Sequence, residues 1–147
     1  MNIYLDIDGV LLEDDSKLSN FAPEFMDYVL TKYPDSTYWL TTHCQGDASV
    51  PMRRLGHMFE PRIAELMLAI KPTSFDHAKT TGIDFSKPFL WFDDNVFDFD
   101  RDILIENNAL DNLIDVDLLK NPNVLQQFIY DFPTMSPHAS AWRWGGL

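Results

Sequence analysis

The sequence contains one cysteine, Cys44, among its 147 residues. A lone cysteine excludes an internal disulfide and any metal site built from several cysteines. The chain also lacks an apolar run that approaches the roughly 20 residues of a membrane-spanning helix. Its amino terminus begins in a strand pattern with two aspartates, which is not the pattern of a signal peptide. These absences predict a cytoplasmic protein that has no membrane partner.

Basic residues are scarce, because 11 Lys and Arg stand against 23 Asp and Glu and give a formal charge of −12. Such an excess of negative charge repels nucleic-acid backbones and anionic membranes. A small anionic ligand is still allowed, since a bound divalent cation and a few cationic side chains can invert the local field. The charge therefore disfavours a long polynucleotide partner.

The composition is that of a globular protein, with 46% apolar and 14% aromatic residues. A chain of this length is expected to form one core domain, which we place over residues 1–132. The tail over residues 133–147 is rich in Pro, Ser and Gly but contains Trp142 and Trp144. Two tryptophans favour packing of the tail on the core or on a partner, and the sequence leaves the oligomeric state open.

The segment Met1 to Leu12 reads MNIYLDIDGVLL and contains the first chemical signal. Residues 3–5 predict a buried strand, and strand alternation puts Asp6 and Asp8 on one side of the chain. Two carboxylates at the end of a buried strand are costly unless a cation holds them, and Mg²⁺ is the natural candidate. Gly9 allows the backbone to turn sharply just beyond them.

Two further strands are predicted, over residues 37–40 and 89–92, and polar side chains follow each of them. The first is β-branched and aromatic, and the second is a continuous apolar run, typical of a central parallel strand. The polar residues that follow are Thr41, Thr42, His43, Asp93 and Asp94. Because functional sites in parallel sheets lie off the carboxyl ends of strands, we expect these residues to lie near Asp6 and Asp8.

Apolar spacing predicts helices between these strands. The expected elements are helices over 20–33, 51–59, 61–70, 74–82 and 122–131, and a fourth strand over 113–117. Residues 13–17 read as a polar loop, and residues 95–109 give no clear pattern. The alternation predicts an α/β fold with right-handed crossovers and a mostly parallel central sheet.

The pattern Asp6-x-Asp8-Gly9-Val10-Leu11, directly after an apolar strand, resembles the first motif of the haloacid dehalogenase-like (HAD) phosphohydrolases. A hydroxyl after the second strand and an acidic pair after residues 89–92 resemble the second and fourth motifs. The resemblance covers nearly the whole chain and implies a HAD-like Rossmannoid three-layer fold. The gaps between motifs are too short for a full cap domain, so the chain looks like a small capless member with an open site.

The resemblance implies a role for each matching residue. Asp6 is then the nucleophile that becomes a phospho-aspartate, and Asp8 is the general acid/base. Thr41 hydrogen-bonds the transferring phosphoryl group, with Thr42 as the next match in register. Lys79 supplies the positive charge of the third motif.

The same resemblance implies a Mg²⁺ site and leaves two assignments open. The implied ligands are Asp6, Asp8 (through its backbone carbonyl), Asp94 and Asp93. Asp94 is favoured as the direct ligand, with Asp93 as the alternative or as support behind it. Lys79 is favoured over Lys71 because it precedes the acidic strand in a Lys-Thr step, although Lys71 also lies between the second and fourth motifs.

Other polar residues have simpler interpretations. Thr42 and His43 are candidate substrate-binding residues at the end of the second strand. A His43–Cys44 catalytic dyad is disfavoured, because adjacent residues on a strand end point in opposite directions. Arg53 and Arg54 could reach an anionic substrate, but a solvated helix face is the simpler interpretation.

Residue types and resemblance together predict an enzyme, a Mg²⁺-dependent phosphomonoester hydrolase that acts through Asp6. The expected substrate is a nucleotide or another bulky phosphate ester, and a nucleic-acid end is a further candidate that the charge disfavours. One alternative is a HAD-fold binding or regulatory protein with weak catalysis. Another is a receiver-like phospho-acceptor domain, against which the Asp-x-Asp spacing on the first strand argues.

Overall fold

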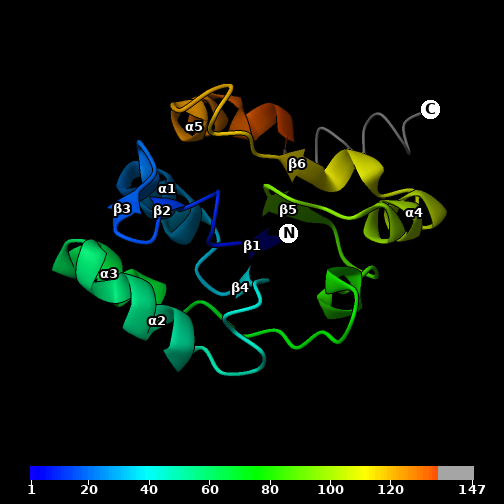
Figure 1. Cartoon of the computed structure of the whole chain (residues 1–147), viewed down its shortest axis with the longest axis horizontal. Helices are drawn as coiled ribbons and strands as arrows, with labels where there is room; N and C mark the ends of the chain where they lie inside the picture. Colours follow the sequence, from blue (N-terminus) through cyan, green and yellow to red (C-terminus); the bar gives the residue numbers. More distant parts are fainter. Residues whose placement is uncertain (136–147) are drawn as a thin grey trace.

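A four-stranded sheet forms the centre of the computed structural model, which describes residues 1–135 (Figure 1). The strands are β1 (Asn2–Leu5), β4 (Thr37–Trp39), β5 (Phe89–Asp93) and β6 (Leu113–Asp115). They lie in the order β4-β1-β5-β6, and every neighbouring pair is parallel. The prediction of an α/β fold with a mostly parallel central sheet is confirmed.

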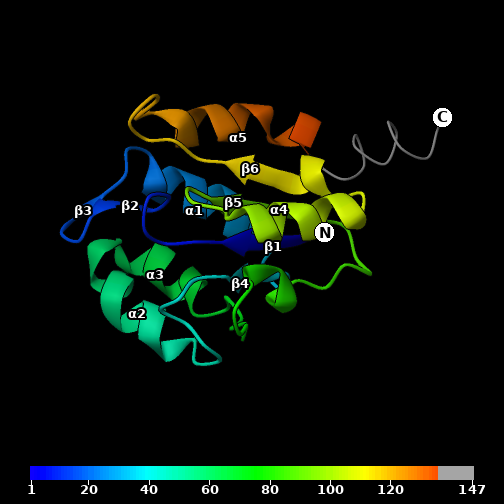
Figure 2. The same cartoon turned by 45° about the vertical axis from the view of Figure 1, so that its right-hand side comes forward.

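Helices cover both faces of this sheet. They are α1 (Ala22–Lys32), α2 (Ser49–Leu55), α3 (Pro61–Met67), α4 (Asp98–Glu106) and α5 (Val124–Met135), with the 3-10 turns η1 (Gly56–Met58), η2 (Lys79–Gly82) and η3 (Leu110–Asn112). Figure 2 shows α1 behind the sheet and α4 in front of it. Helices α3 and α5 both contact α1, whereas η2 and η3 contact α4.

Strand β5 is buried along its whole length because both of its faces are covered. Leu90 and Phe92 face the core that α1, α3 and α5 form. Phe89 and Trp91 face the second core, on the side of α4. This is why its sequence is a continuous apolar run and not an alternating one.

An aromatic cluster fixes β5 between α1 and α5. The ring centroid of Phe92 lies 5.3 Å from that of Phe25 and 5.4 Å from that of Phe128, and Phe132 stacks on it as well. Burying one such side chain contributes about 1.5–3 kcal/mol to folding. The cluster therefore holds the end of β5, and with it Asp93, in a defined position.

Residues 13–17 form part of a hairpin, so the prediction of a polar loop is wrong. Strands β2 (Leu12–Asp14) and β3 (Lys17–Leu18) pair in an antiparallel ladder. The carboxylate of Asp14 accepts hydrogen bonds from the backbone N–H and the hydroxyl of Ser16, at 2.9 and 3.0 Å. An aspartate side chain that bonds to the backbone in this way reverses the chain without a glycine. The segment therefore has no glycine turn signal, and its acidic composition reads as a loop.

The remaining differences concern helices. Helix α4 occupies the segment that gave no clear pattern, and the helix predicted over 74–82 is reduced to η2. Helix α5 continues to Met135, beyond the predicted end at residue 131. The part of the tail that contains Trp142 and Trp144 lies outside the described residues. None of the helices within residues 1–135 is both long and apolar enough to cross a membrane.

Candidate active site

The predicted acidic residues meet at the carboxyl ends of two adjacent parallel strands. Asp6 follows β1, and Asp93 and Asp94 lie at the end of β5. From β1 the chain passes first to β4 on one side and then to β5 on the other, so the strand order reverses here. In open α/β sheets such a switch point forms a crevice in which ligands bind.

Three carboxylates and one ammonium group form the centre of this crevice. Oxygen atoms of Asp6, Asp93 and Asp94 all lie within 4.8 Å of one another. The Nζ atom of Lys79 lies 2.7 Å from Asp93 Oδ2 and 3.4 Å from Asp6 Oδ1. Asp6 is 7% exposed and Asp93 is fully buried. One ammonium does not balance three ionised carboxylates, so these three residues are the ones that could hold a hard divalent cation.

The surroundings of these groups perturb their protonation. Burial, reinforced by the charge of Asp93, raises the pKa of Asp6 to about 8, although Lys79 acts in the opposite direction. Burial and the charge of Asp93 also raise the pKa of Asp94. For Lys79, burial alone would lower the pKa, but the charges of Asp6 and Asp93 outweigh burial and raise it. A large pKa shift such as that of Asp6 is typical of functional sites.

Gly9 is required by the geometry of the turn after β1. Its φ angle is +76°, in the left-handed region that side chains rarely adopt. A Cβ atom at this position would overlap the carboxylate of Asp94. The glycine therefore lets the first acidic loop approach the second closely.

The two residues of the acidic pair have different surroundings. Asp93 accepts a hydrogen bond from the backbone N–H of Asn95 at 2.9 Å through Oδ1, and Lys79 binds its other oxygen. Asp94 is exposed and lies against Gly9. Asp94 is thus the better placed of the two to bind a cation directly, with Asp93 holding Lys79 behind it.

Lys79, and not Lys71, lies among the carboxylates. The exposed Lys71 instead places its Nζ atom 5.7 Å from the ring centroid of Tyr38. Lys79 is positioned by η2, which is bound to α4 through the buried Asp100. A carboxylate oxygen of Asp100 accepts hydrogen bonds from the backbone N–H of Thr80 at 3.0 Å and from its hydroxyl at 2.7 Å.

The carboxylate of Asp8 is held apart from the three-carboxylate cluster. His43 Nε2 lies 2.7 Å from Asp8 Oδ2, and Arg54 Nη2 donates to Asp8 Oδ1 at 2.8 Å. Arg54 also donates to Asp15 Oδ1 of the hairpin at 3.0 Å and contacts His43 Nε2 through Nη1. The proton on this ring nitrogen decides whether His43 donates to Asp8 or accepts from Arg54.

The interpretation of Arg54 as part of a solvated helix face is wrong, while Arg53 is exposed as expected. Arg53 bonds to Ser49 one turn earlier on α2, at 2.8 Å. The signal that could have identified Arg54 is helical spacing. Pro51 and Leu55 are the buried residues of α2 and define its inner face. Arg54 follows Pro51 by three residues, a spacing that places it beside this face.

The hydroxyl residues after β4 lie in unlike surroundings. Thr41 is buried, and its Oγ1 accepts a hydrogen bond from the backbone N–H of His43 at 3.3 Å. Thr42 is exposed.

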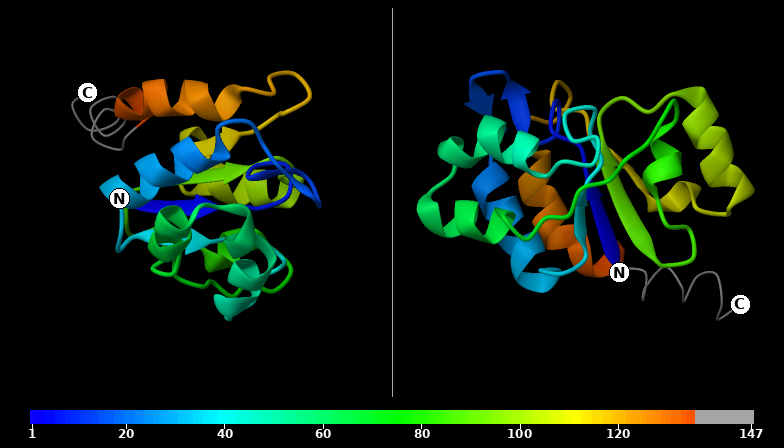
Figure 3. Two further views of the ribbon diagram at one scale, coloured as in Figure 1. Left: turned by 90° about the vertical axis from the view of Figure 1, so that its left-hand side faces the viewer. Right: turned by 90° about the horizontal axis from the view of Figure 1, so that it is seen from below.

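The right-hand view of Figure 3 shows the carboxyl ends of the strands. The blue hairpin and α2 lie on one side of them, and the start of α4 lies on the other.

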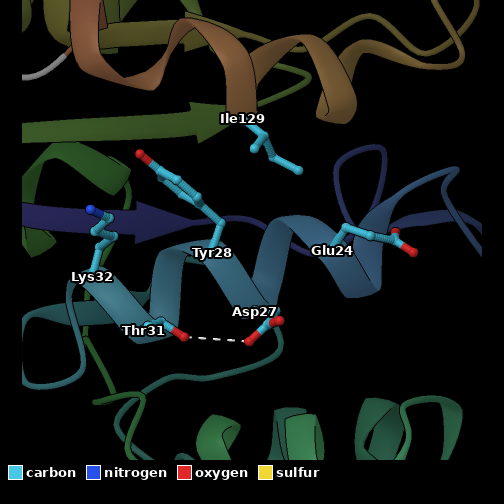
Figure 4. Close-up of a pocket in the computed structure, with 6 residues that line it drawn as sticks. All are labelled: Glu24, Asp27, Tyr28, Thr31, Lys32 and Ile129. Atoms are coloured by element: carbon cyan, nitrogen blue, oxygen red, sulfur yellow. Dashed lines mark hydrogen bonds between the residues drawn. The ribbon is translucent and has the colours of Figure 1, made fainter.

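A hollow elsewhere on the described surface lies between α1 and α5 (Figure 4). Its lining consists of Glu24, Asp27, Tyr28, Thr31, Lys32 and Ile129. Both signs of charge occur in this lining, and none of the predicted site residues belongs to it. Convergence of titratable groups therefore points to the strand ends and not to this hollow.

Comparisons of the chain with protein-family models, with curated proteins and with solved structures found no match. The interpretation of the site therefore depends on the residues of this chain and on their geometry.

Proposed function

We propose that the chain is a Mg²⁺-dependent phosphomonoester hydrolase of the HAD-like type that works through a phospho-aspartate on Asp6. One observation carries the proposal above the others, namely the convergence of Asp6, Asp93 and Asp94 with Lys79 at the ends of β1 and β5. A buried carboxylate beside an ammonium group suits a nucleophile that must accept a dianionic phosphoryl group.

The donor set fits Mg²⁺ because it consists of carboxylate oxygens, the ligands that this hard cation prefers. We propose Asp6 and Asp94 as direct ligands, together with the backbone carbonyl of Asp8. When bound, Mg²⁺ would offset the negative charge that Asp6 and the phosphate oxygens bring together.

The chain's own residues then perform two displacements. An oxygen of Asp6 attacks phosphorus, the bond to the leaving oxygen breaks, and Asp8 gives that oxygen a proton. Asp8 next removes a proton from water, the resulting hydroxide attacks phosphorus, and the bond to Asp6 breaks to release inorganic phosphate. Lys79 and the Thr41 hydroxyl stabilise charge on the phosphoryl oxygens during both steps.

The placement of Asp8 supports its role as acid and base. His43 and Arg54 each contact one oxygen of its carboxylate and so orient it apart from the proposed metal ligands. Thr42 is exposed and His43 contacts Asp8, and we propose that both residues contact the substrate. No inserted domain lies within residues 1–135, which supports the capless type with an open site.

A receiver-like phospho-acceptor domain remains the second candidate, because it would also use carboxylates and a lysine at the ends of parallel strands. The Asp8–His43–Arg54 group favours the hydrolase, since a residue that activates water is needed for turnover and not for a long-lived phospho-aspartate. The two functions therefore differ in the lifetime of the phosphorylated Asp6.

The test is hydrolysis of para-nitrophenyl phosphate with Mg²⁺, with EDTA, and by the Asp6→Asn variant. We expect turnover that requires Mg²⁺ and is lost in Asp6→Asn, while Asp102→Asn, a change of an exposed carboxylate on α4, serves as the matched control and keeps its activity. A folded protein without turnover, which nevertheless retains phosphate on Asp6 after treatment with acetyl phosphate, would favour the receiver-like function. Absence of both reactions would contradict a reactive Asp6.

A further inference from the structure

Three aromatic rings form an exposed stack between the segment just before η2 and the start of α4. The rings of His77 and Phe99 have centroids 4.8 Å apart at 18°, and those of Phe99 and Phe97 lie 5.5 Å apart at 22°. Phe97 is 56% exposed and Phe99 is 36% exposed. Because the two phenylalanine rings are contiguous and exposed, they are a candidate binding surface.

The stack is built on the two segments that position the site. Phe97 follows Asp94 by three residues, and His77 precedes Lys79 by two. Since an extended chain spans about 3.5 Å per residue, the backbone of each ring lies within about 11 Å of a site residue. The Thr80–Asp100 hydrogen bonds join these segments, and Figure 3 shows α4 starting beside the carboxyl end of β5.

The charges around the stack select among possible occupants. Asp98 lies between the two phenylalanines in sequence and is exposed. Asp76, next to His77, is also a carboxylate, and hydrogen bonds from the N–H groups of His77 and Ala78 lower its pKa and so favour its charged form. These carboxylates repel a phosphate or a polyanion at the stack itself. They do not oppose an uncharged planar ring, which binds to aromatic faces by stacking.

We infer that the His77–Phe99–Phe97 stack is a nucleobase subsite, so that the substrate is a nucleoside monophosphate with its phosphate at Asp6 and its base on Phe97. The inference rests on the proposed function for the phosphate end only. A single base on a short aromatic stack also agrees with the charge of −12, which disfavours a long nucleic acid.

Binding is measured by isothermal titration calorimetry with Mg²⁺ on the Asp6→Asn protein, which cannot consume the ligand. The probes are adenosine 5′-monophosphate, ribose 5-phosphate and adenosine. We expect adenosine 5′-monophosphate to bind about ten-fold or more tightly than ribose 5-phosphate, the effect of one base–aromatic stack. Adding Phe97→Ala should remove this difference, and Phe97→Tyr should keep it. Ile105→Ala is the matched control, because Ile105 is an exposed apolar residue on α4, the helix that follows Phe97.

Equal affinities for the two phosphates, or a preference that survives Phe97→Ala, would overturn the inference. A second set of results would also overturn it: the protein sediments as a dimer, and Phe97→Ala makes it a monomer without changing its affinity for the nucleotide. A second copy of the chain would then be the partner that covers the stack. Adenosine separates the two proposals. Adenosine binding that requires Phe97, in a protein without Mg²⁺-dependent turnover, would support the base subsite and contradict the phosphohydrolase.

Discussion

Asp6 is a carboxylate that folding removes almost entirely from water, and this makes the stability of the metal-free protein depend on pH. Its pKa is about 8 in the folded state, against an ordinary value of 3.8. Between these values the folded state binds more protons than the unfolded state, so the free energy of unfolding falls as the pH rises. We predict a loss of stability from pH 5 to pH 8 in EDTA.

Urea denaturation at the two pH values measures this effect. The Asp6→Asn variant should lose much of the pH dependence, and Mg²⁺ should stabilise the wild-type protein more at pH 8 than at pH 5, because the cation binds the ionised carboxylate. Carboxylates such as Asp84, whose pKa is lowered by hydrogen bonds from Ser86, contribute below pH 4 and outside this window. If the free energy of unfolding depends on pH equally in the wild-type protein and in Asp6→Asn, Asp6 is not the group responsible.

Arg54 is a positioning residue in the proposed mechanism, because it donates a hydrogen bond to the carboxylate of Asp8. General acid catalysis contributes about 10²- to 10⁴-fold, and loss of orientation should remove part of this, about ten-fold, in Arg54→Ala. The loss should be larger for an alkyl phosphate than for para-nitrophenyl phosphate, whose leaving group needs little protonation. We predict a lower kcat with little change in KM.

Two variants separate positioning from a general effect of charge. Arg54→Lys keeps the positive charge without the forked donor geometry and should fall between the wild-type protein and Arg54→Ala. Arg53→Ala removes a charge from the same helix and should leave the kinetics unchanged. Equal losses for both leaving groups in Arg54→Ala would contradict the positioning of Asp8 as an acid.

At the scale of elements, the turn after β1 connects the fold to the proposed Mg²⁺ site. Gly9→Ala places a side chain in the left-handed region and against Asp94, so we predict a destabilisation of about 1–3 kcal/mol and weaker Mg²⁺ binding. Gly56→Ala is the matched control, because Gly56 has a helical φ of −56°. Urea denaturation and Mg²⁺ titration measure both effects. Wild-type affinity for Mg²⁺ in Gly9→Ala would contradict the close approach of the two loops.

The link between η2 and α4 is the second element that supports the site. Asp100→Ala leaves the N–H and hydroxyl groups of Thr80 unpaired in the core, at a cost of about 1–3 kcal/mol. Because Lys79 precedes Thr80, we also predict reduced turnover of para-nitrophenyl phosphate. Asp100→Asn keeps a hydrogen-bond acceptor and should retain most of the stability and most of the turnover. The exposed Asp98→Ala tests the loss of a carboxylate from the same helix, and an equal effect of that variant would contradict a specific role of Asp100.

Elements with strong periodicity were predictable from the sequence, and those built from side-chain hydrogen bonds were not. The strand over 89–92 and the helix over 20–33 have apolar patterns that burial imposes, and the structure contains both as β5 and α1. The hairpin β2–β3 was missed because the Asp14–Ser16 bonds that close it leave no apolar pattern.

At the scale of the whole molecule, the convergence of the acidic residues could be predicted because chain topology brings the strand ends together. Asp6 and Asp93 are far apart in sequence, yet the parallel pairing of β1 with β5 makes them neighbours. Arg54 was missed for a different reason, since its spacing from Pro51 places it only beside the buried face of α2, and the packing of that helix is what brings it to Asp8. The aromatic stack likewise depends on how η2 meets α4.

Under the proposed function, the net charge of −12 predicts a preference among phosphate esters of different length. A 5′-phosphorylated oligonucleotide brings many charges into the field of the acidic surface, whereas a mononucleotide brings only its own phosphate. The Debye length falls from about 30 Å at 0.01 M salt to about 3 Å at 1 M, so the repulsion weakens as salt is added. We predict that the ratio of kcat/KM for the mononucleotide to that for the oligonucleotide is greatest at low salt and falls as salt increases. Steady-state kinetics on the two substrates, with the same terminal base, measure this ratio. A preference for the oligonucleotide that is strongest at low salt would instead indicate attraction of the phosphate backbone, and would contradict selection of short substrates by the acidic surface.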